Sequence, residues 1–175
     1  MRMKKISSII CAAVLAVSMF AGCAGGNTPS ETSASNKAQV NSFKCEWKGV
    51  DITPGKDCKA AIEALGDGYK YFSGADCAYE GMNSVYDYTD VTLYAYTEKD
   101  GADELISIVE VKGADLKTPE GVGNGDSPDK IKEVYGVPAV ENKGGLLYKS
   151  DKMELSFFVK DGKVTSMTYS LVRGE

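Results

Sequence analysis

Histidine is absent from this chain of 175 residues, and that absence excludes two common classes of catalytic site. The Ser-His-Asp and Cys-His arrangements both need an imidazole as general base. The cysteines never form a Cys-x-x-Cys pair, so the usual zinc and redox motifs are missing as well. The sequence therefore predicts a protein that is not an enzyme and that needs no metal or other cofactor.

Two further ligand-binding motifs are incomplete. The glycine-rich stretch at 121–126 lacks the lysine and Ser/Thr pair of a phosphate-binding P-loop. We interpret it as a turn into a helix capped by Asp126 or Ser127, with Pro128 in the first turn. The acidic residues at 98–104 do not have the spacing of an EF-hand loop, and we interpret them as a solvated hairpin tip.

The chain has no dense basic patch. It carries 25 acidic and 20 basic side chains, for a net charge of −5, so nucleic-acid binding is not expected. An apolar stretch at 6–20 follows Arg2, Lys4 and Lys5, which is the order of a signal peptide. This stretch is too short to span a bilayer as a stable helix.

The apolar stretch ends in Phe-Ala-Gly before Cys23, and this resembles a lipobox, the site where bacterial lipoproteins are cleaved and lipidated. Phe20 stands where an aliphatic residue is usual, and the alternative is an ordinary secretory signal followed by a chance cysteine. We expect residues 1–22 to be a lipoprotein signal peptide. Cys23 would then carry a lipid that anchors an extracytoplasmic protein to the cell membrane.

Small and polar side chains dominate residues 23–42, which predicts a flexible tether. Three cysteines lie beyond it: Cys45, Cys58 and Cys77. Outside the cytoplasm we expect one disulfide and one remaining thiol. We favour a bond between Cys58 and Cys77, which would tie the start of a helix to the loop beyond its end. A bond between Cys45 and Cys58 is the rival.

Two parts of the chain present the same order of elements. Residues 43–118 and 119–175 each contain a glycine, a short helix and three short strands, and Tyr88 aligns with Tyr148. A helix on three strands has little core of its own, whereas two such units can share a longer sheet. We therefore predict an internal duplication. The expected fold is α+β, with two tandem helix-plus-three-strand repeats that share an antiparallel sheet and helices on one face.

The expected elements follow from hydrophobic periodicity and capping residues. In the first part they are a strand at 43–50, a helix at 59–65 capped by Asp57, an irregular stretch at 68–81, and strands at 85–88, 91–97 and 105–112. In the second part they are a short helix ending at Tyr135, a strand at Tyr148, a strand at 153–159 and a strand through Val164 and Met167. A β-bulge near Thr165 is needed to place Val164 and Met167 on one side.

Several motifs of the second part occur in a familiar order: Gly125, Tyr-Gly-x-Pro at 135–138, Tyr148, Leu-Ser-Phe at 155–157 and Asp-Gly-Lys-Val-x-Ser at 161–166. This order resembles the tandem-repeat fold of the secreted beta-lactamase inhibitory protein and of related small outer-membrane-assembly lipoproteins. Residues 73–88 and 118–121 are also similar to uncharacterised lipoproteins of Gram-positive gut bacteria. The resemblance covers residues 47–169. It implies a sheet whose open concave face grips a partner, but the inhibitor's target-gripping residues form no motif in this chain, so none is assigned.

Strand alternation predicts which side chains lie on that open face. At 91–97 the aliphatic residues alternate with Tyr94 and Tyr96, and at 153–159 they alternate with Phe158. We predict that Tyr94, Tyr96 and Phe158 form a binding face for a protein or cell-wall partner. The favoured function is a non-catalytic, cell-surface lipoprotein. The alternatives are an envelope assembly or scaffold lipoprotein and an enzyme with an unrecognised site.

Overall fold

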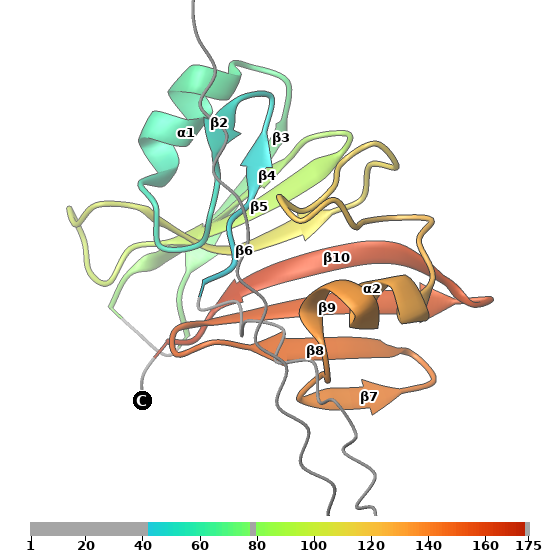
Figure 1. Cartoon of the computed structure of the whole chain (residues 1–175). Coiled ribbons are helices and arrows are strands. Elements are labelled where there is room, and N and C mark those ends of the chain that lie inside the picture. Colours follow the sequence, from blue (N-terminus) through green and yellow to red (C-terminus); the bar gives the residue numbers. More distant parts are fainter. Residues whose placement is uncertain (1–41, 78–79, 174–175) are drawn as a thin grey trace, which may run out of the picture. The chain divides into compact units, whose positions relative to one another are not determined.

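The computed structural model describes residues 42–77 and 80–173 (Figure 1). The predicted signal peptide, most of the predicted tether and Cys23 lie outside these residues. The described residues include no helix long and apolar enough to cross a membrane.

Two helices of eight residues each occur in the described part, α1 (Cys58–Leu65) and α2 (Pro128–Tyr135). Asp57 caps α1, because its carboxylate accepts a hydrogen bond from the Ala60 N–H at 2.7 Å. Ser127 caps α2 in the same way, accepting from the Lys130 N–H at 3.3 Å. Both helices end at a glycine with positive φ, a conformation that glycine adopts without strain. The predicted helix positions and the Asp57 cap are confirmed.

The strands form two antiparallel sheets. A small hairpin joins β1 (Glu46–Trp47) to β2 (Val50–Asp51). The large sheet has eight strands in the order β3-β4-β5-β6-β10-β9-β8-β7. The bounds are β3 (Lys70–Ala75), β4 (Met82–Asp87), β5 (Val91–Tyr96), β6 (Leu105–Val111), β7 (Val140–Asn142), β8 (Gly145–Lys149), β9 (Met153–Lys160) and β10 (Lys163–Leu171).

The predicted fold class, α+β with helix-plus-three-strand repeats, is wrong. The described part is mostly β, and its helix is confined to two short segments. Strand β3 lies where an irregular stretch was expected, and β7 was not expected, so each half of the large sheet has four strands. The expected strand at 43–50 is instead a hairpin, because Lys48 (φ 51°) and Gly49 (φ 79°) form its turn. The predicted duplication of 43–118 and 119–175 stays a prediction.

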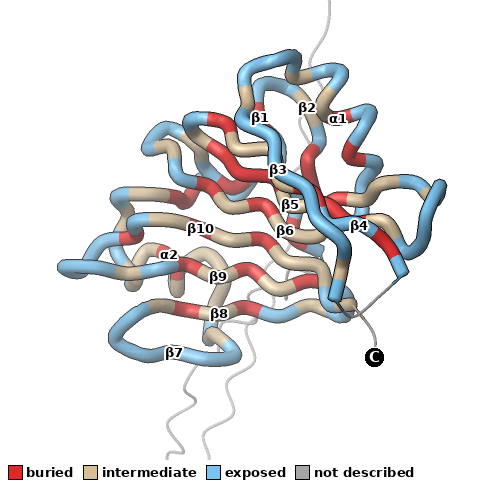
Figure 2. The backbone as a smooth tube through the Cα atoms, turned by 180° about the vertical axis from the view of Figure 1, so that it is seen from behind, coloured by how far each residue is buried: buried red, intermediate tan, exposed pale blue. Residues whose placement is uncertain are grey.

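One face of the large sheet packs into a single core. Leu93 on β5, Leu155 on β9 and Tyr169 on β10 are at most 1% exposed. The helices add Ala61 and Ile131 to this same buried cluster. In Figure 1 α2 lies in front of β9 and β10, and in the reverse view of Figure 2 it lies behind them. The other face of the sheet is therefore the one left without a helix.

The predicted β-bulge in β10 is confirmed. The register between β10 and β9 shifts between Val164 and Ser166, so Thr165 is the extra residue. As a result Val164 and Met167 are both buried in the core, 2% and 0% exposed, although strict alternation would place them on opposite faces.

A buried tyrosine holds the end of each helix. The Tyr88 hydroxyl donates to the Gly66 carbonyl, and the Tyr148 hydroxyl donates to the Gly136 carbonyl, both at 3.1 Å. Carbonyls in the last turn of a helix lack partners within it, so each tyrosine satisfies one such group. Burial, together with Tyr69 in the first case and Glu141 in the second, raises the pKa of Tyr88 and of Tyr148 to about 12. Both hydroxyls therefore remain donors at neutral pH.

Candidate functional site

The sheet face opposite the core is half-exposed along most of its length, as the tan segments of Figure 2 show. The strand register places its side chains in rows that run across the sheet. One row pairs Thr92 with Glu110, Glu110 with Thr168, and Thr168 with Ser156. We call this side the open face.

A second row on the open face is apolar over four strands. Phe72 on β3 pairs with Val85 on β4, Val85 pairs with Tyr94 on β5, and Tyr94 pairs with Ile108 on β6. Phe72 is 61% exposed and the other three are half-buried. We call these four residues the apolar row. It is the feature of the open face best suited to bind an apolar surface, since directly opposed side chains form one continuous strip.

The apolar row does not continue into the other half of the sheet. The residues that continue the same line across the sheet are polar. Ile108 pairs with Ser170 on β10, Ser170 pairs with Glu154 on β9, and Glu154 pairs with Lys149 on β8. Lys149 and Glu154 form an ion pair at 2.7 Å. The open face is thus aromatic and aliphatic over β3–β6 but polar over the same row of β10, β9 and β8.

Tyr94, the first predicted site residue, lies within the apolar row. Burial raises the pKa of its hydroxyl, and the nearby carboxylates of Glu110 and Asp87 raise it further. The phenol therefore stays neutral at physiological pH, and its ring offers an apolar surface with a polar tip.

Tyr96, the second predicted site residue, is covered. It is only 6% exposed, because the Arg173 guanidinium stacks on its ring at 4.0 Å from the centroid. Arg173 also forms an ion pair with Asp76 at 3.6 Å. A partner docking on the open face would not reach this ring while Arg173 is in place.

Phe158, the third predicted site residue, is 48% exposed but lies far from Tyr94. The register separates the two by three strands across the sheet and four residues along β9. Strand spacing and rise place them roughly 20 Å apart. Phe158 instead lines a shallow, mainly apolar pocket of about 330 Å³ with residues of β7 and β8, among them Val140 and Leu147.

A second pocket, of about 310 Å³, lies between the β1–β2 turn and residues 113–117. Trp47, Lys48, Asp90 and Asp115 are among the residues that line it. The Lys48 ammonium lies 4.3 Å from the centre of the Trp47 ring. The pocket therefore mixes charges of both signs around one aromatic side chain.

The predicted Cys58–Cys77 disulfide is not present, and the rival Cys45–Cys58 bond is absent too. All three described cysteines are free thiols; Cys45 and Cys58 are buried, whereas Cys77 is exposed. Cys58 is thus buried in the core on α1, whereas Cys77 lies at the surface just beyond β3. Burial, and next Asp51 at Cys45 and Glu104 at Cys58, raises each pKa to about 12. These two thiols are therefore protonated and poor nucleophiles.

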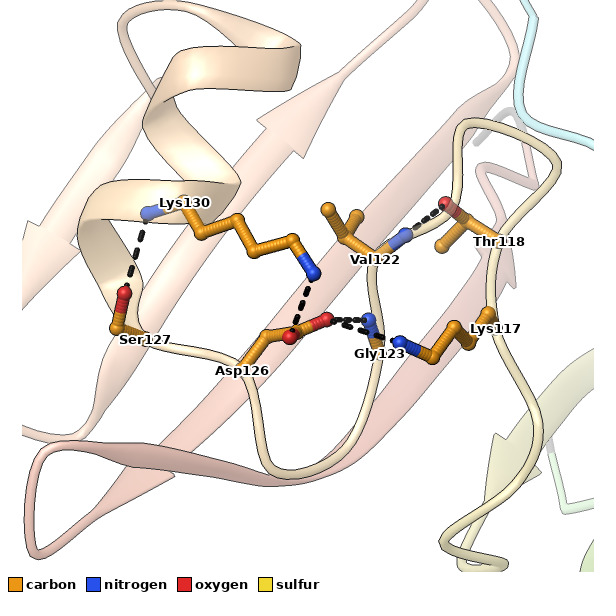
Figure 3. Close-up of polar contacts among 7 residues, drawn as sticks. All are labelled: Lys117, Thr118, Val122, Gly123, Asp126, Ser127 and Lys130. Carbon is orange, nitrogen blue, oxygen red and sulfur yellow. Dashed lines mark hydrogen bonds and ion pairs between the residues drawn. The ribbon is translucent and has the colours of Figure 1, made fainter.

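The glycine-rich loop before α2 contains the carboxylate of Asp126, whose contacts are drawn in Figure 3. One Asp126 carboxylate oxygen accepts from the Gly123 N–H at 2.9 Å and the other accepts from the Lys130 ammonium at 2.7 Å. Lys117 lies 3.7 Å from the same carboxylate. Hydrogen bonding from Lys130, then from Gly123, lowers the pKa of Asp126. The loop is a turn into the helix, as expected, with Ser127 as the cap.

The other carboxyl groups with a shifted pKa are also ionised partners of cations. Lys112 lowers the pKa of Asp87 by a hydrogen bond of 2.6 Å. Partial burial of Asp51 opposes a lower pKa, but hydrogen bonds from Thr53 and Lys56 outweigh it. Among the described residues no group of three Cys, Asp or Glu is placed to hold a metal ion.

Sequence reasoning missed Phe72, Val85 and Ile108. Residues 68–81 show no alternation of apolar and polar side chains, so the sequence predicts no strand at Phe72. The signal that could have found it is the pair of adjacent aromatics Tyr71 and Phe72, which favour a strand even though glycines flank them.

The chain was also compared with known proteins. No family model, no curated protein and no solved structure matches it. The resemblance to the inhibitor-like lipoproteins therefore stays a prediction.

Proposed function

We propose that the protein is a cell-surface lipoprotein whose sheet domain binds a protein partner, without catalysis, through the open face. The apolar row is the observation that carries this proposal. It places Phe72, Val85, Tyr94 and Ile108 side by side on the one sheet face without a helix. The half-exposed polar residues Glu110 and Thr168 lie along the next row, which gives the arrangement of an apolar centre with a polar rim.

The row is better suited to a protein than to a polar wall polymer. Burying an exposed phenylalanine side chain stabilises a complex by about 1.5–3 kcal/mol, and aromatic residues dominate binding energy at protein interfaces. Both Tyr94 and Phe72 present rings, and neither is flanked on its strand by an acidic residue. A cell-wall partner remains a distinct outcome of the experiment below.

The decisive variant is Phe72→Ala with Tyr94→Ala, compared with a control that changes two exposed residues elsewhere, Val137→Ala with Val140→Ala. Each protein is immobilised and exposed to surface extract of the source organism, and the retained material is quantified by mass spectrometry. The Phe72/Tyr94 variant should lose one protein that the wild type and the control both retain. The loss should be about tenfold or more, as expected for hot-spot residues.

Two treatments of the extract identify the class of partner. Digestion with protease should abolish retention, whereas digestion with a cell-wall hydrolase should leave it unchanged. Equal retention by the two double variants would rule out the apolar row. Loss only after wall hydrolysis would replace the protein partner with a wall polymer.

The membrane anchor is tested separately, because it rests on Cys23 alone. Cells that express the chain are grown with a clickable fatty acid, and incorporation is followed on gels. The wild-type chain should be labelled and should fractionate with membranes, whereas Cys23→Ser should be unlabelled. Equal labelling of the two chains would show that Cys23 is not the lipid site.

A further inference from the structure

The two edges of the large sheet are built differently. The β7 edge has three residues, and its Glu141 is held by Lys132 of α2 at 2.9 Å. The β3 edge has six residues, and all six are exposed. Short edge strands and charged side chains protect a sheet from pairing with another chain. By that measure the fold protects β7 and leaves β3 open.

Strand β3 has few of the features that prevent strand pairing. It contains no proline, and Lys70 is its single charged residue. It pairs with β4 in an unbroken register of six residues, without a bulge. Beside Gly74 no heavy atom lies within 4 Å of the place where a Cβ would be. A neighbouring strand could therefore approach β3 along its whole length.

The residues of β3 are complementary to themselves. If two copies of β3 run antiparallel with Ser73 opposite Ser73, then Phe72 faces Gly74 of the second copy and Tyr71 faces Ala75. An aromatic ring across from a glycine is a favourable pair, because the ring covers the bare backbone. The same register sets Lys70 opposite Asp76, whose carboxylate is already paired with Arg173 of its own chain, so that no like charges meet. All these pairs keep the alternation of faces that an antiparallel sheet requires.

We infer that β3 binds β3 of a second copy of this chain, edge to edge, in the register centred on Ser73. A two-fold axis at Ser73 makes the contact self-complementary, as a closed dimer needs. It would join the two large sheets and place the two apolar rows on the same face, offset from each other by two residues along β3. The inference shares Phe72 with the apolar row, but it stands without the proposed function, because cross-linking at Ser73 tests the strand edge and needs no partner on the open face.

The dimer should be weak. It rests on one pair of short strands and two aromatic side chains per copy, a smaller contact than the roughly 1,200 Å² at which stable interfaces begin. We expect sedimentation equilibrium of the full chain to show a dimer that forms as concentration rises. Phe72→Lys should shift the chain to monomer at every concentration, because it removes the ring and adds a like charge at the contact.

Disulfide trapping tests the register. In a background where Cys11, Cys23 and Cys77 are replaced by serine, Ser73→Cys places two thiols on the two-fold axis. Directly opposed residues of antiparallel strands have Cα atoms about 4.5–5.5 Å apart, within the range for a disulfide. Mild oxidation of the full chain should therefore trap a dimer on a non-reducing gel. Glu141→Cys on the β7 edge, in the same background, is the matched control and should stay monomeric.

Mixing two different cysteine variants tests the register more sharply than either variant alone. Chains with Tyr71→Cys should cross-link to chains with Ala75→Cys and not to themselves, because only the mixed pair is opposed in this register. The inference is overturned if Ser73→Cys yields no more dimer than Glu141→Cys, or if adding Phe72→Lys leaves its yield unchanged. Self-cross-linking of Tyr71→Cys would overturn the register. Trapping of Ser73→Cys to a different protein in cells, without the homodimer, would show that another chain occupies the edge.

Discussion

The halves of the large sheet, β3–β6 and β7–β10, are alike on the core side and different on the open face. On the core side each half anchors its helix with a tyrosine, through Tyr88 to Gly66 and through Tyr148 to Gly136. On the open face the first half carries the apolar row, whereas the second half presents Ser170, Glu154 and Lys149 in the same row.

This contrast separates what folding requires from what it does not. Packing fixes the core side, where a lost contact destabilises the whole sheet. Phe72 is 61% exposed, so burial in the core does not explain its apolar ring. Side chains that differ between two similarly packed halves are therefore the first place to look for binding.

The largest expected effect tests whether the halves share one core. Leu93→Ala and Leu155→Ala remove equivalent fully buried side chains from the two halves. Each should lower the free energy of unfolding by about 2–5 kcal/mol. Urea unfolding is followed by the fluorescence of Trp47, the only tryptophan, and by far-ultraviolet circular dichroism. Both signals should shift together in both variants; a Trp47 transition that Leu155→Ala does not move would show that the halves unfold separately.

A smaller effect tests whether the helices are held alike. Tyr88→Phe and Tyr148→Phe keep the ring and remove the hydroxyl that donates to the end of the helix. Each should cost about 1 kcal/mol of unfolding free energy, the usual net worth of such a hydrogen bond. The variants are compared by urea midpoint at equal slope. If only one of the two variants lost unfolding free energy, the two halves would not hold their helices in the same way.

The smallest effect concerns the loop before α2, where Asp126 binds Lys130 and the Gly123 N–H. Because the pKa of Asp126 is lowered on folding, its contribution is present above the ordinary value of 3.8 and is lost as pH falls through the lower folded pKa. Asp126→Asn should therefore cost up to about 1 kcal/mol at pH 7 and progressively less in acid. The measurement is the urea midpoint as a function of pH.

Asp129→Asn is the control for that experiment, since Asp129 is 89% exposed on the same helix. It should change the midpoint little at any pH. If Asp126→Asn had the same cost in acid as at neutral pH, the ionised carboxylate would not be the source of the stability.

Local signals predicted much of the fold. Asp57 and Gly66 mark the ends of α1 by capping chemistry, and the bulge at Thr165 follows from the conflict between Val164 and Met167. The edge strand β3 could not be found by alternation, because both of its faces are exposed and no buried side selects apolar residues. Because β3 and β7 were not predicted, the sequence indicated an α+β fold, whereas the described part is mostly β.

The candidate site was predicted in part. Alternation placed Tyr94 on the open face, but it could not reveal that Arg173, from beyond the last strand, covers Tyr96. Nor could it show that Tyr94 and Phe158 lie at distant places, since their separation depends on which strands pair. Such long-range facts are set by topology and not by local pattern.

The position of β10 has a consequence for how the chain is made. It is the last described strand in sequence, yet it lies in the middle of the large sheet between β6 and β9. A ribosome that synthesises the chain from its amino end delivers seven strands before the one that joins them. Until then the inner edges of β6 and β9 have no partner and can pair wrongly. The large sheet therefore cannot be completed until β10 has been synthesised.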